Sequence, residues 1–172
     1  MIDLRFSESE LEARRENITS FIADTVDAAG VDGAVLGLSG GVDSSLTASL
    51  AVEVLGAGSL YGLVLPATVS SEDNMSDAER VAEDLGIEND VIEIDPIVGK
   101  LLDAYPDAEG DATAVGNSRA RVRSVLNYLV ANHENRVVLG TGNKSEAMTG
   151  YFRPIRSRNR APSGAYRRSR WR

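Results

Sequence analysis

Apolar residues recur at helical spacing near the start of the chain. Ser7 and Glu10 have the spacing of a capping box, and the apolar positions that follow lie on one face of a helix: Leu11, Ile18, Phe21, Ile22 and Val26. Gly30 is a typical helix stop. The pattern predicts an amphipathic helix that opens the chain and ends before Gly30.

Short runs that are apolar on both alternating faces indicate buried strands of a parallel sheet. These runs alternate with stretches of helical periodicity along the chain. The pattern predicts strands over 33–38, 60–65, 90–94 and 136–139, and helices over 43–54, 76–85, 97–104 and 118–132. We therefore predict an α/β fold, a doubly wound parallel sheet flanked by helices, which binds its ligands at the carboxyl ends of the strands.

The composition is that of an ordinary globular chain of 172 residues, of which 42% are apolar and 26% charged. The longest apolar runs fall far short of the roughly 18 to 20 residues that a membrane-spanning helix needs. The first residues lack the pattern of a signal peptide, so we expect a cytoplasmic protein with no membrane partner. The lack of cysteine excludes disulfides and thiolate metal sites. The only histidine, His133, is expected at the surface or at a helix end.

Charge is divided unevenly along the chain. Residues 1–152 carry 10 basic and 26 acidic side chains, whereas residues 153–172 carry eight arginines and no acidic residue. An arginine-rich arm that binds nucleic acid or anionic lipid is one explanation. The other is a segment foreign to the fold, produced by a shifted reading frame or an altered end. The segment shows neither apolar periodicity nor alternating basic and aromatic residues, so we expect the second explanation and no nucleic-acid partner.

The segment after the first strand has the composition of a phosphate-binding turn. It reads Gly37-Leu38-Ser39-Gly40-Gly41-Val42-Asp43-Ser44 and leads directly into a helix. Adjacent glycines let backbone amides approach a ligand, serines add hydroxyl donors, and the helix N-terminus is positive. An acidic residue in such a loop repels phosphate unless a cation lies between them. Asp43 is therefore predicted to be a Mg²⁺ ligand, with a helix N-cap as the alternative.

Ser39-Gly40-Gly41-Val42-Asp43-Ser44 resembles the SGGxDS signature of the ATP pyrophosphatases, which split ATP between its α and β phosphates to adenylate a substrate. Within that superfamily, two further stretches are similar to ammonia-dependent NAD⁺ synthetases. These are residues 116–123, GNSRARVR, and residues 138–152, VLGTGNKSEAMTGYF. The resemblance covers residues 1–152 and makes them an ATP pyrophosphatase-type NAD synthetase domain, followed by the tail 153–172.

The resemblance implies a homodimeric enzyme with an adenine-nucleotide-α-hydrolase-like, Rossmann-like sheet. In that family MgATP adenylates the carboxylate of deamido-NAD⁺, and ammonia converts the acyl adenylate into NAD⁺ and AMP. By position, residues 37–44 and Thr141 would bind ATP, and Arg121 would contact deamido-NAD⁺. Asp43 and Glu146 would hold Mg²⁺, and Asp43 and Arg121 are the predicted catalytic residues.

Two of these residues have simpler explanations. Arg121 can lie on a solvated helix face instead of binding a phosphate or a carboxylate. Glu146 can cap a helix or lie at the surface instead of binding a metal ion. Arg119 and Arg123 lie two residues to either side of Arg121, so the three cannot all point the same way.

The resemblance ends at Phe152. The family continues with further lysine and aspartate residues of its substrate sites and with the last part of its sheet, whereas here no lysine follows Lys144. Loss of one such electrostatic group reduces a rate by roughly 10² to 10³, so we expect slow turnover and a fold that lacks its C-terminal part. Two other functions stay open: a non-catalytic nucleotide-binding partner, and an ATP pyrophosphatase that acts on another acceptor such as tRNA.

Overall fold

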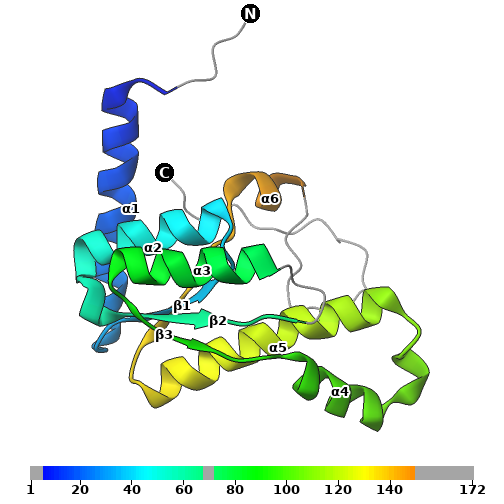
Figure 1. Cartoon of the computed structure of the whole chain (residues 1–172). Helices are drawn as coiled ribbons and strands as arrows, with labels where there is room; N and C mark the ends of the chain where they lie inside the picture. The colour runs from blue at the N-terminus through cyan, green and yellow to red at the C-terminus, as the bar shows by residue number, and fades with distance from the viewer. Residues whose placement is uncertain (1–5, 68–71, 150–172) are drawn as a thin grey trace, which may run out of the picture. The chain divides into compact units, whose positions relative to one another are not determined.

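The computed structural model describes residues 6–67 and 72–149 (Figure 1). The chain divides into two units, Met1–Thr141 and Gly142–Arg172. The first unit contains α1 (Glu8–Ala29), β1 (Ala34–Leu38), α2 (Val42–Leu55), β2 (Leu60–Val64), α3 (Glu72–Leu85), β3 (Glu88–Val91), α4 (Asp95–Ala104), α5 (Ala112–His133) and β4 (Val137–Leu139). It also holds two short 3₁₀ turns, η1 (Ala57–Ser59) and η2 (Pro106–Ala108), and the second unit contains α6 (Lys144–Thr149). The predicted tail, 153–172, lies outside the described residues.

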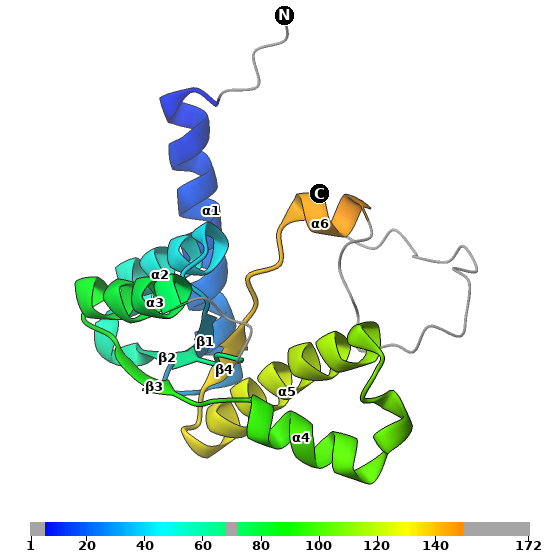
Figure 2. The same cartoon turned by 45° about the vertical axis from the view of Figure 1, so that its right-hand side comes forward.

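The described strands form one parallel sheet in the order β3-β2-β1-β4. Helices α2 and α3 cover one face of this sheet, and α4 and α5 cover the other (Figures 1 and 2). The predicted doubly wound α/β fold is therefore confirmed. From β1 the chain adds β2 and then β3 on one side, and it then crosses back to add β4 on the other side of β1. The strand order therefore reverses between β1 and β4. Ligands of open α/β sheets bind at the carboxyl ends of the strands beside such a point.

Alternation along β1 divides the core into two clusters. Ala34, Leu36 and Leu38 face α1, α2 and α3, where the contacting residues are small or slender: Ile22, Ala48, Ala51, Ala78 and Ala82. On the opposite face Val35 packs with residues of β2, α4 and α5: Leu63, Val98 and Val122. Short alanine side chains let α2 and α3 approach the sheet closely.

Helix α1 is packed against the sheet only near its end. Its capping box is present, because Ser7 N donates to Glu10 Oε2 at 2.9 Å and Glu10 N donates to Ser7 Oγ at 3.3 Å. Gly30 ends the helix with a φ of 64°.

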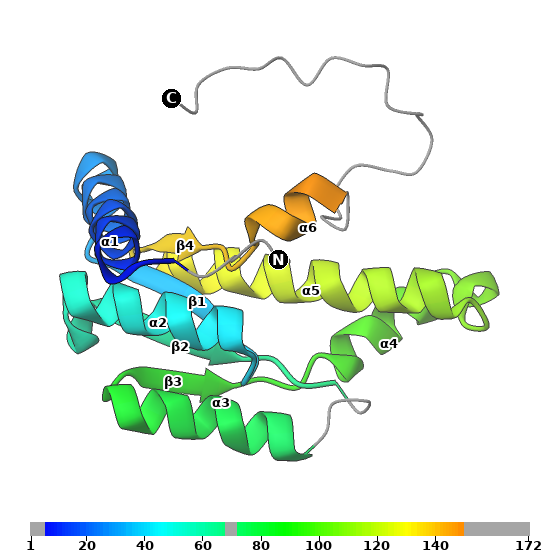
Figure 3. The ribbon, with the colours of Figure 1, turned by 90° about the horizontal axis from the view of Figure 1, so that it is seen from above.

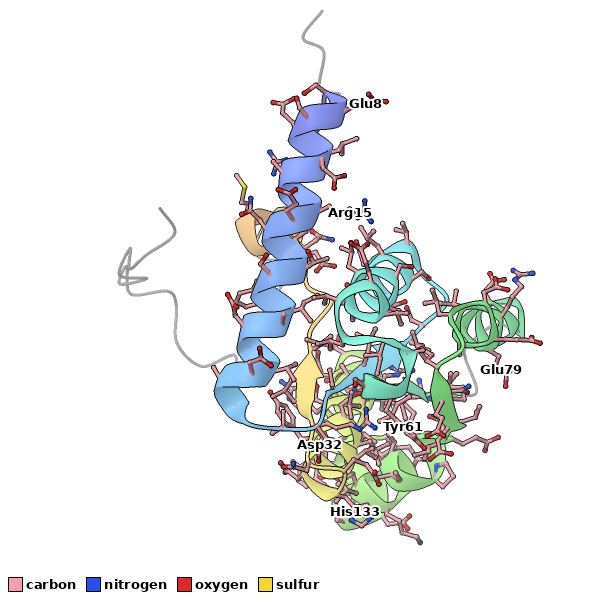
Figure 4. The ribbon with its side chains drawn as sticks, turned by 90° about the vertical axis from the view of Figure 1, so that its left-hand side faces the viewer. Glu8, Arg15, Asp32, Tyr61, Glu79 and His133 are labelled. Atoms are coloured by element: carbon pink, nitrogen blue, oxygen red, sulfur yellow. The ribbon has the colours of Figure 1, made fainter. Side chains whose placement is uncertain are left out.

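The expected apolar face of α1 is buried only at Ile22 and Val26, whereas Leu11, Ile18 and Phe21 are exposed. The first half of the helix stands clear of the sheet, and Arg15 bonds Glu53 of α2 at 2.9 Å (Figure 4). The predicted amphipathic helix is therefore present, but only the last part of its apolar face is buried.

Several element boundaries differ from the predictions: α3 begins at Glu72 rather than at residue 76, and α4 at Asp95 rather than at residue 97. Helix α5 begins at Ala112 rather than at residue 118, because the Asp111 carboxylate accepts from Thr113 N at 2.8 Å and from Ala114 N at 3.0 Å. Strand β3 lies at 88–91 rather than at 90–94, and Ile94 becomes a fully buried residue at the start of α4. Over the described residues, the structure holds no helix with the length and apolar content to cross a bilayer.

Candidate active site

Connecting segments leave the carboxyl edge of the sheet after each strand, and three of them follow β1 or one of its two neighbours. Residues 39–41 follow β1, residues 65–67 follow β2, and Gly140 and Thr141 follow β4. Thr141 is half-buried there, directly after the strand that borders β1. The predicted ATP-binding residues 37–44 and Thr141 therefore belong to neighbouring strand ends, as the fold class requires.

The loop after β1 is held in shape by its own serines. Gly40 has a φ of 72°, a left-handed conformation that favours glycine. Ser44 is only 3% exposed, and its hydroxyl donates to Gly41 O at 2.9 Å while accepting from Ser39 N at 3.3 Å. Ser45 Oγ also donates to Gly41 O, at 3.0 Å. The serines expected to act as ligand donors thus serve first to fold the loop.

The first turn of α2 has the geometry of an anion site. Gly41 is its N-cap, so the cap has no side chain to accept from the first amides of the helix. An uncapped N-terminus with its positive dipole end suits a phosphate. Asp43 lies inside this turn and is exposed, and the N-cap alternative for Asp43 is wrong.

Leu38 and Val42 differ in what they can offer a ligand. The Leu38 side chain is 4% exposed and packs so closely on Gly62 that an added Cβ there would lie 2.7 Å from Leu38 Cδ1. Leu38 can therefore present only its backbone. Val42, by contrast, is 78% exposed beside the loop.

The three arginines of α5 point in two directions, as their spacing predicts. Arg121 is exposed, and its Nη1 donates to Asn117 O one turn back at 3.0 Å. Arg119 Nε donates to Asp95 Oδ1 at 2.9 Å, and Arg123 Nε donates to Leu65 O, just past β2, at 2.8 Å. Arg121 is the predicted site residue, whereas Arg119 and Arg123 are the arginines that lie at the strand ends.

The Arg123 guanidinium is partly buried and lies near a second positive charge, that of Arg119. Burial, together with the charge of Arg119, lowers the pKa of the Arg123 guanidinium below its usual value, while the Asp95 carboxylate opposes the shift. Both effects disfavour the charged form of the Arg123 guanidinium. The spacing of four residues between the two arginines was the available sequence signal that they share one helix face.

Asn127, which the sequence analysis did not select, joins α5 to β1. Its Nδ2 donates to Arg123 O at 2.9 Å, and a Cβ added to Gly37 would lie 3.3 Å from that nitrogen. Asn127 Oδ1 is buried and accepts no hydrogen bond within the described part of the chain. Gly37 thus belongs to the site as the place where α5 touches the strand that leads into the loop.

Glu146 belongs to the second unit and caps α6. Its carboxylate accepts from Asn143 N at 3.2 Å, and Glu146 N donates to Asn143 Oδ1 at 2.9 Å. His133 is at the surface as expected, with a side chain that is 83% exposed and an Nε2 that lies 3.6 Å from Glu134 Oε1. Among the described residues no group of three His, Cys, Asp or Glu side chains is placed to hold a metal ion.

Comparison with known proteins identifies the family. The family model described as NAD synthase matches residues 14–154. The chain belongs to the NAD synthase family. The NH(3)-dependent NAD(+) synthetase of Halobacterium salinarum is 65% identical over 151 residues, which cover 88% of this chain and 56% of the relative. The chain therefore spans about half the length of the curated relatives it matches.

Solved structures of the NAD synthase family have the same fold. The NH3-dependent NAD synthetase of Campylobacter jejuni is 35% identical with a TM-score of 0.76, over 82% of this chain and 60% of that one. The NMN synthetase of Francisella tularensis is 34% identical with a TM-score of 0.77, over 86% and 60% of the two chains. A Rossmann-like sheet is thus shared by relatives whose names give two different products.

Proposed function

We propose that the chain contains the ATP-binding part of an ammonia-dependent NAD⁺ synthetase, which amidates deamido-NAD⁺ and releases AMP and pyrophosphate. The observation that carries this proposal is the loop 39–41, whose left-handed glycine and uncapped helix start form an anion site at the carboxyl end of β1. The family match and the NH3-dependent relatives support ammonia as the nitrogen donor.

The reaction assigns distinct tasks to these residues. A carboxylate oxygen of deamido-NAD⁺ attacks the α phosphorus of ATP, the bond to the oxygen of the β phosphate breaks, and pyrophosphate leaves. Ammonia then adds to the acyl carbon, loses a proton and displaces AMP. We assign residues 37–44 and Thr141 to ATP, with backbone contacts only from Leu38, and we assign Arg121 to deamido-NAD⁺.

Oxygen ligands at the phosphate loop fit Mg²⁺, which binds proteins through one or two carboxylates together with substrate phosphates. Asp43 is exposed in the first turn of α2, where a cation would neutralise both its own charge and that of a phosphate. Asp43 and Glu146 are the residues we assign to hold it. Mg²⁺ would supply charge neutralisation to the leaving pyrophosphate.

The remaining expectations form part of the same proposal. We assign residues 1–152 to the synthetase domain and 153–172 to a segment foreign to its fold. We further propose that the protein acts in the cytoplasm as a homodimer, with deamido-NAD⁺ and ammonia as its substrates.

The experiment is a product assay with the full chain, ATP, MgCl₂, deamido-NAD⁺ and ammonium chloride. Formation of NAD⁺, AMP and pyrophosphate in equal amounts is expected, and Gly40→Ala should abolish it because alanine disfavours the left-handed loop conformation. Gly99→Ala is the matched control, since nothing lies within 4 Å of its added Cβ. Equal rates for the two variants would contradict the assignment of the loop.

The same assay separates the other functions. ATP binding without any product indicates a non-catalytic nucleotide-binding partner, and pyrophosphate release that depends on tRNA indicates another acceptor. Replacing deamido-NAD⁺ with nicotinate mononucleotide tests the acceptor that the name of the Francisella relative suggests.

A further inference from the structure

Helix α5 runs past the carboxyl ends of the strands (Figures 1 and 3). Three of its polar residues, each four positions after the last, follow that edge in order. Arg119 bonds Asp95 at the start of α4 after β3, and Arg123 bonds Leu65 O after β2. Asn127 lies beside Gly37 of β1, since an added Cβ there would be 3.3 Å from its Nδ2. We call Arg119, Arg123 and Asn127 the polar row.

The middle member of the polar row lies beside the phosphate loop. In the sheet register Leu38 pairs with Val64, so Ser39 and Leu65 are the next residues on two neighbouring strands. Neighbouring strands are about 4.8 Å apart. The anchor of Arg123 on Leu65 O is therefore about one strand spacing from the first residue of the loop. The loop leads into α2 on one face of the sheet, and Arg123 extends from α5 on the other face. The loop and Arg123 therefore lie on either side of the carboxyl edge.

The charges of this cluster are unbalanced. Arg119 and Arg123 bring two guanidinium groups and Asp95 one carboxylate, so the three groups sum to one positive charge. Arg123 is half-buried and uses only Nε for Leu65, and within the described part of the chain its Nη1 and Nη2 donate no hydrogen bond. A guanidinium offers these two donors in a planar fork that matches a phosphate or a carboxylate.

We propose that Arg123 binds an anionic group of a nucleotide seated at the carboxyl edge, through Nη1 and Nη2, while Nε stays on Leu65 O. The nucleotide is ATP or the carboxylate-bearing acceptor, and in this form the inference rests on the proposed function. Arg119 is the positioning residue, because its bond to Asp95 holds the adjacent turn of α5 toward the strand ends. Arg123 is thereby an anion-binding residue in addition to the loop and Arg121.

The test is calorimetric titration of the full chain and of Arg123→Gln with ATP, deamido-NAD⁺ and inorganic pyrophosphate, each variant first checked for folding by circular dichroism. Loss of one charge-assisted contact should raise Kd about 10- to 100-fold. A change confined to ATP identifies a phosphate of ATP as the anion, and a change confined to deamido-NAD⁺ identifies the acceptor. Arg80→Gln is the matched control, because its side chain on α3 is 69% exposed.

Two outcomes overturn the inference. If Arg123→Gln lowers Tm but leaves every Kd within about twofold of the wild type, Arg123 only ties α5 to β2. If Arg123→Gln fails to fold, Arg123→Lys replaces it, and a Kd for all three probes within about twofold of the wild type then refutes the need for a guanidinium fork.

The pyrophosphate titration distinguishes this failure from failure of the proposed function. A wild-type chain that binds neither nucleotide, yet binds pyrophosphate through Arg123, refutes the synthetase assignment and leaves the anion site standing. A chain that binds none of the three probes refutes both.

Discussion

Helices α2 and α5 lie on opposite faces of the sheet, and they reach its carboxyl edge by different means. The N-terminus of α2 lies at this edge, and its contributions come from its N-cap Gly41 and from Ser44 in its first turn. Helix α5 passes the edge with its side, and its contributions are long side chains such as Arg123, which bonds a residue 58 positions away. Helix α2 therefore contributes backbone groups to this edge, whereas α5 contributes charged side chains.

This difference has consequences for substitution. A change in the loop disturbs hydrogen bonds that close within five residues, so its effect stays near the phosphate site. A change in the polar row of α5 disturbs contacts between elements far apart in sequence, so it alters the stability of the fold as well. Substitutions at this edge can therefore distinguish the contributions of the two helices. Changes near α2 should act mainly at the phosphate site, whereas changes in the polar row of α5 should also lower the stability of the fold.

The largest expected effect is at Gly37, where the two sides of the site touch. Gly37→Val forces a branched side chain against the Asn127 amide, which already lies 3.3 Å from an added Cβ. We expect a loss of about 1–3 kcal/mol from overpacking, measured by urea unfolding. Adding Asn127→Ala should recover part of it, and a double variant as unstable as the single one would show that α5 is not the obstacle.

Ser44→Ala tests the α2 side alone. Its hydroxyl is buried and accepts from Ser39 N, so removing it leaves this amide without that acceptor, whereas Gly41 O keeps Ser45 N and Ser45 Oγ as donors. A loss of about 1–2 kcal/mol in the free energy of unfolding is expected, with weaker ATP binding. Ser49→Ala is the control, because exposed Ser49 only donates to Ser45 O and should change stability by less than about 0.5 kcal/mol. Similar losses for both serines would disprove the special role of Ser44.

Arg119→Gln tests the α5 side. Its ion pair with Asp95 is mostly shielded, with side chains 24% and 23% exposed, so we expect a loss of about 1 kcal/mol and weaker binding of the ligand that Arg123 contacts. Lys100→Gln breaks a comparable pair with Asp103 that is 84% exposed on the lysine side, and should have almost no effect. Thermal unfolding of both variants at low ionic strength measures the difference. A larger loss for Lys100→Gln would reverse the proposed ranking.

The smallest effect lies at the other end of the strands and depends on pH. The Tyr61 hydroxyl donates to Asp90 Oδ2 at 2.9 Å, and this bond raises the pKa of Tyr61 above its usual value, with partial burial adding to the shift (Figure 4). A raised pKa means that the bond stabilises the fold fully below the unfolded value of about 10 and is lost as the pH rises above it.

Between pH 9 and about pH 11.5 the Tm of the wild type should therefore fall more steeply than that of Tyr61→Phe. Tyr128→Phe, on the exposed side of α5, is the matched control and should follow the wild type. Parallel curves for the wild type and Tyr61→Phe would show that the bond does not contribute.

Most of the fold was predictable because its signals are local. The capping box at Ser7, the stop at Gly30 and the apolar run of β1 each depend on interactions within a few residues or on burial of both sheet faces. The boundary errors have the same origin. Asp111 is a cap that the predicted start at residue 118 overlooked, and α5 continues through Gly116.

Local interactions account for the order of strands and helices along the chain and for the phosphate-binding loop, since glycines and short hydroxyl side chains act on their own neighbours. Long-range packing, by contrast, turns Arg123 rather than Arg121 to the strand ends, places Asn127 beside Gly37 and leaves the first part of α1 exposed. A long side chain or a helix face takes its direction from whatever packs against it. Those partners lie tens of residues away in the chain.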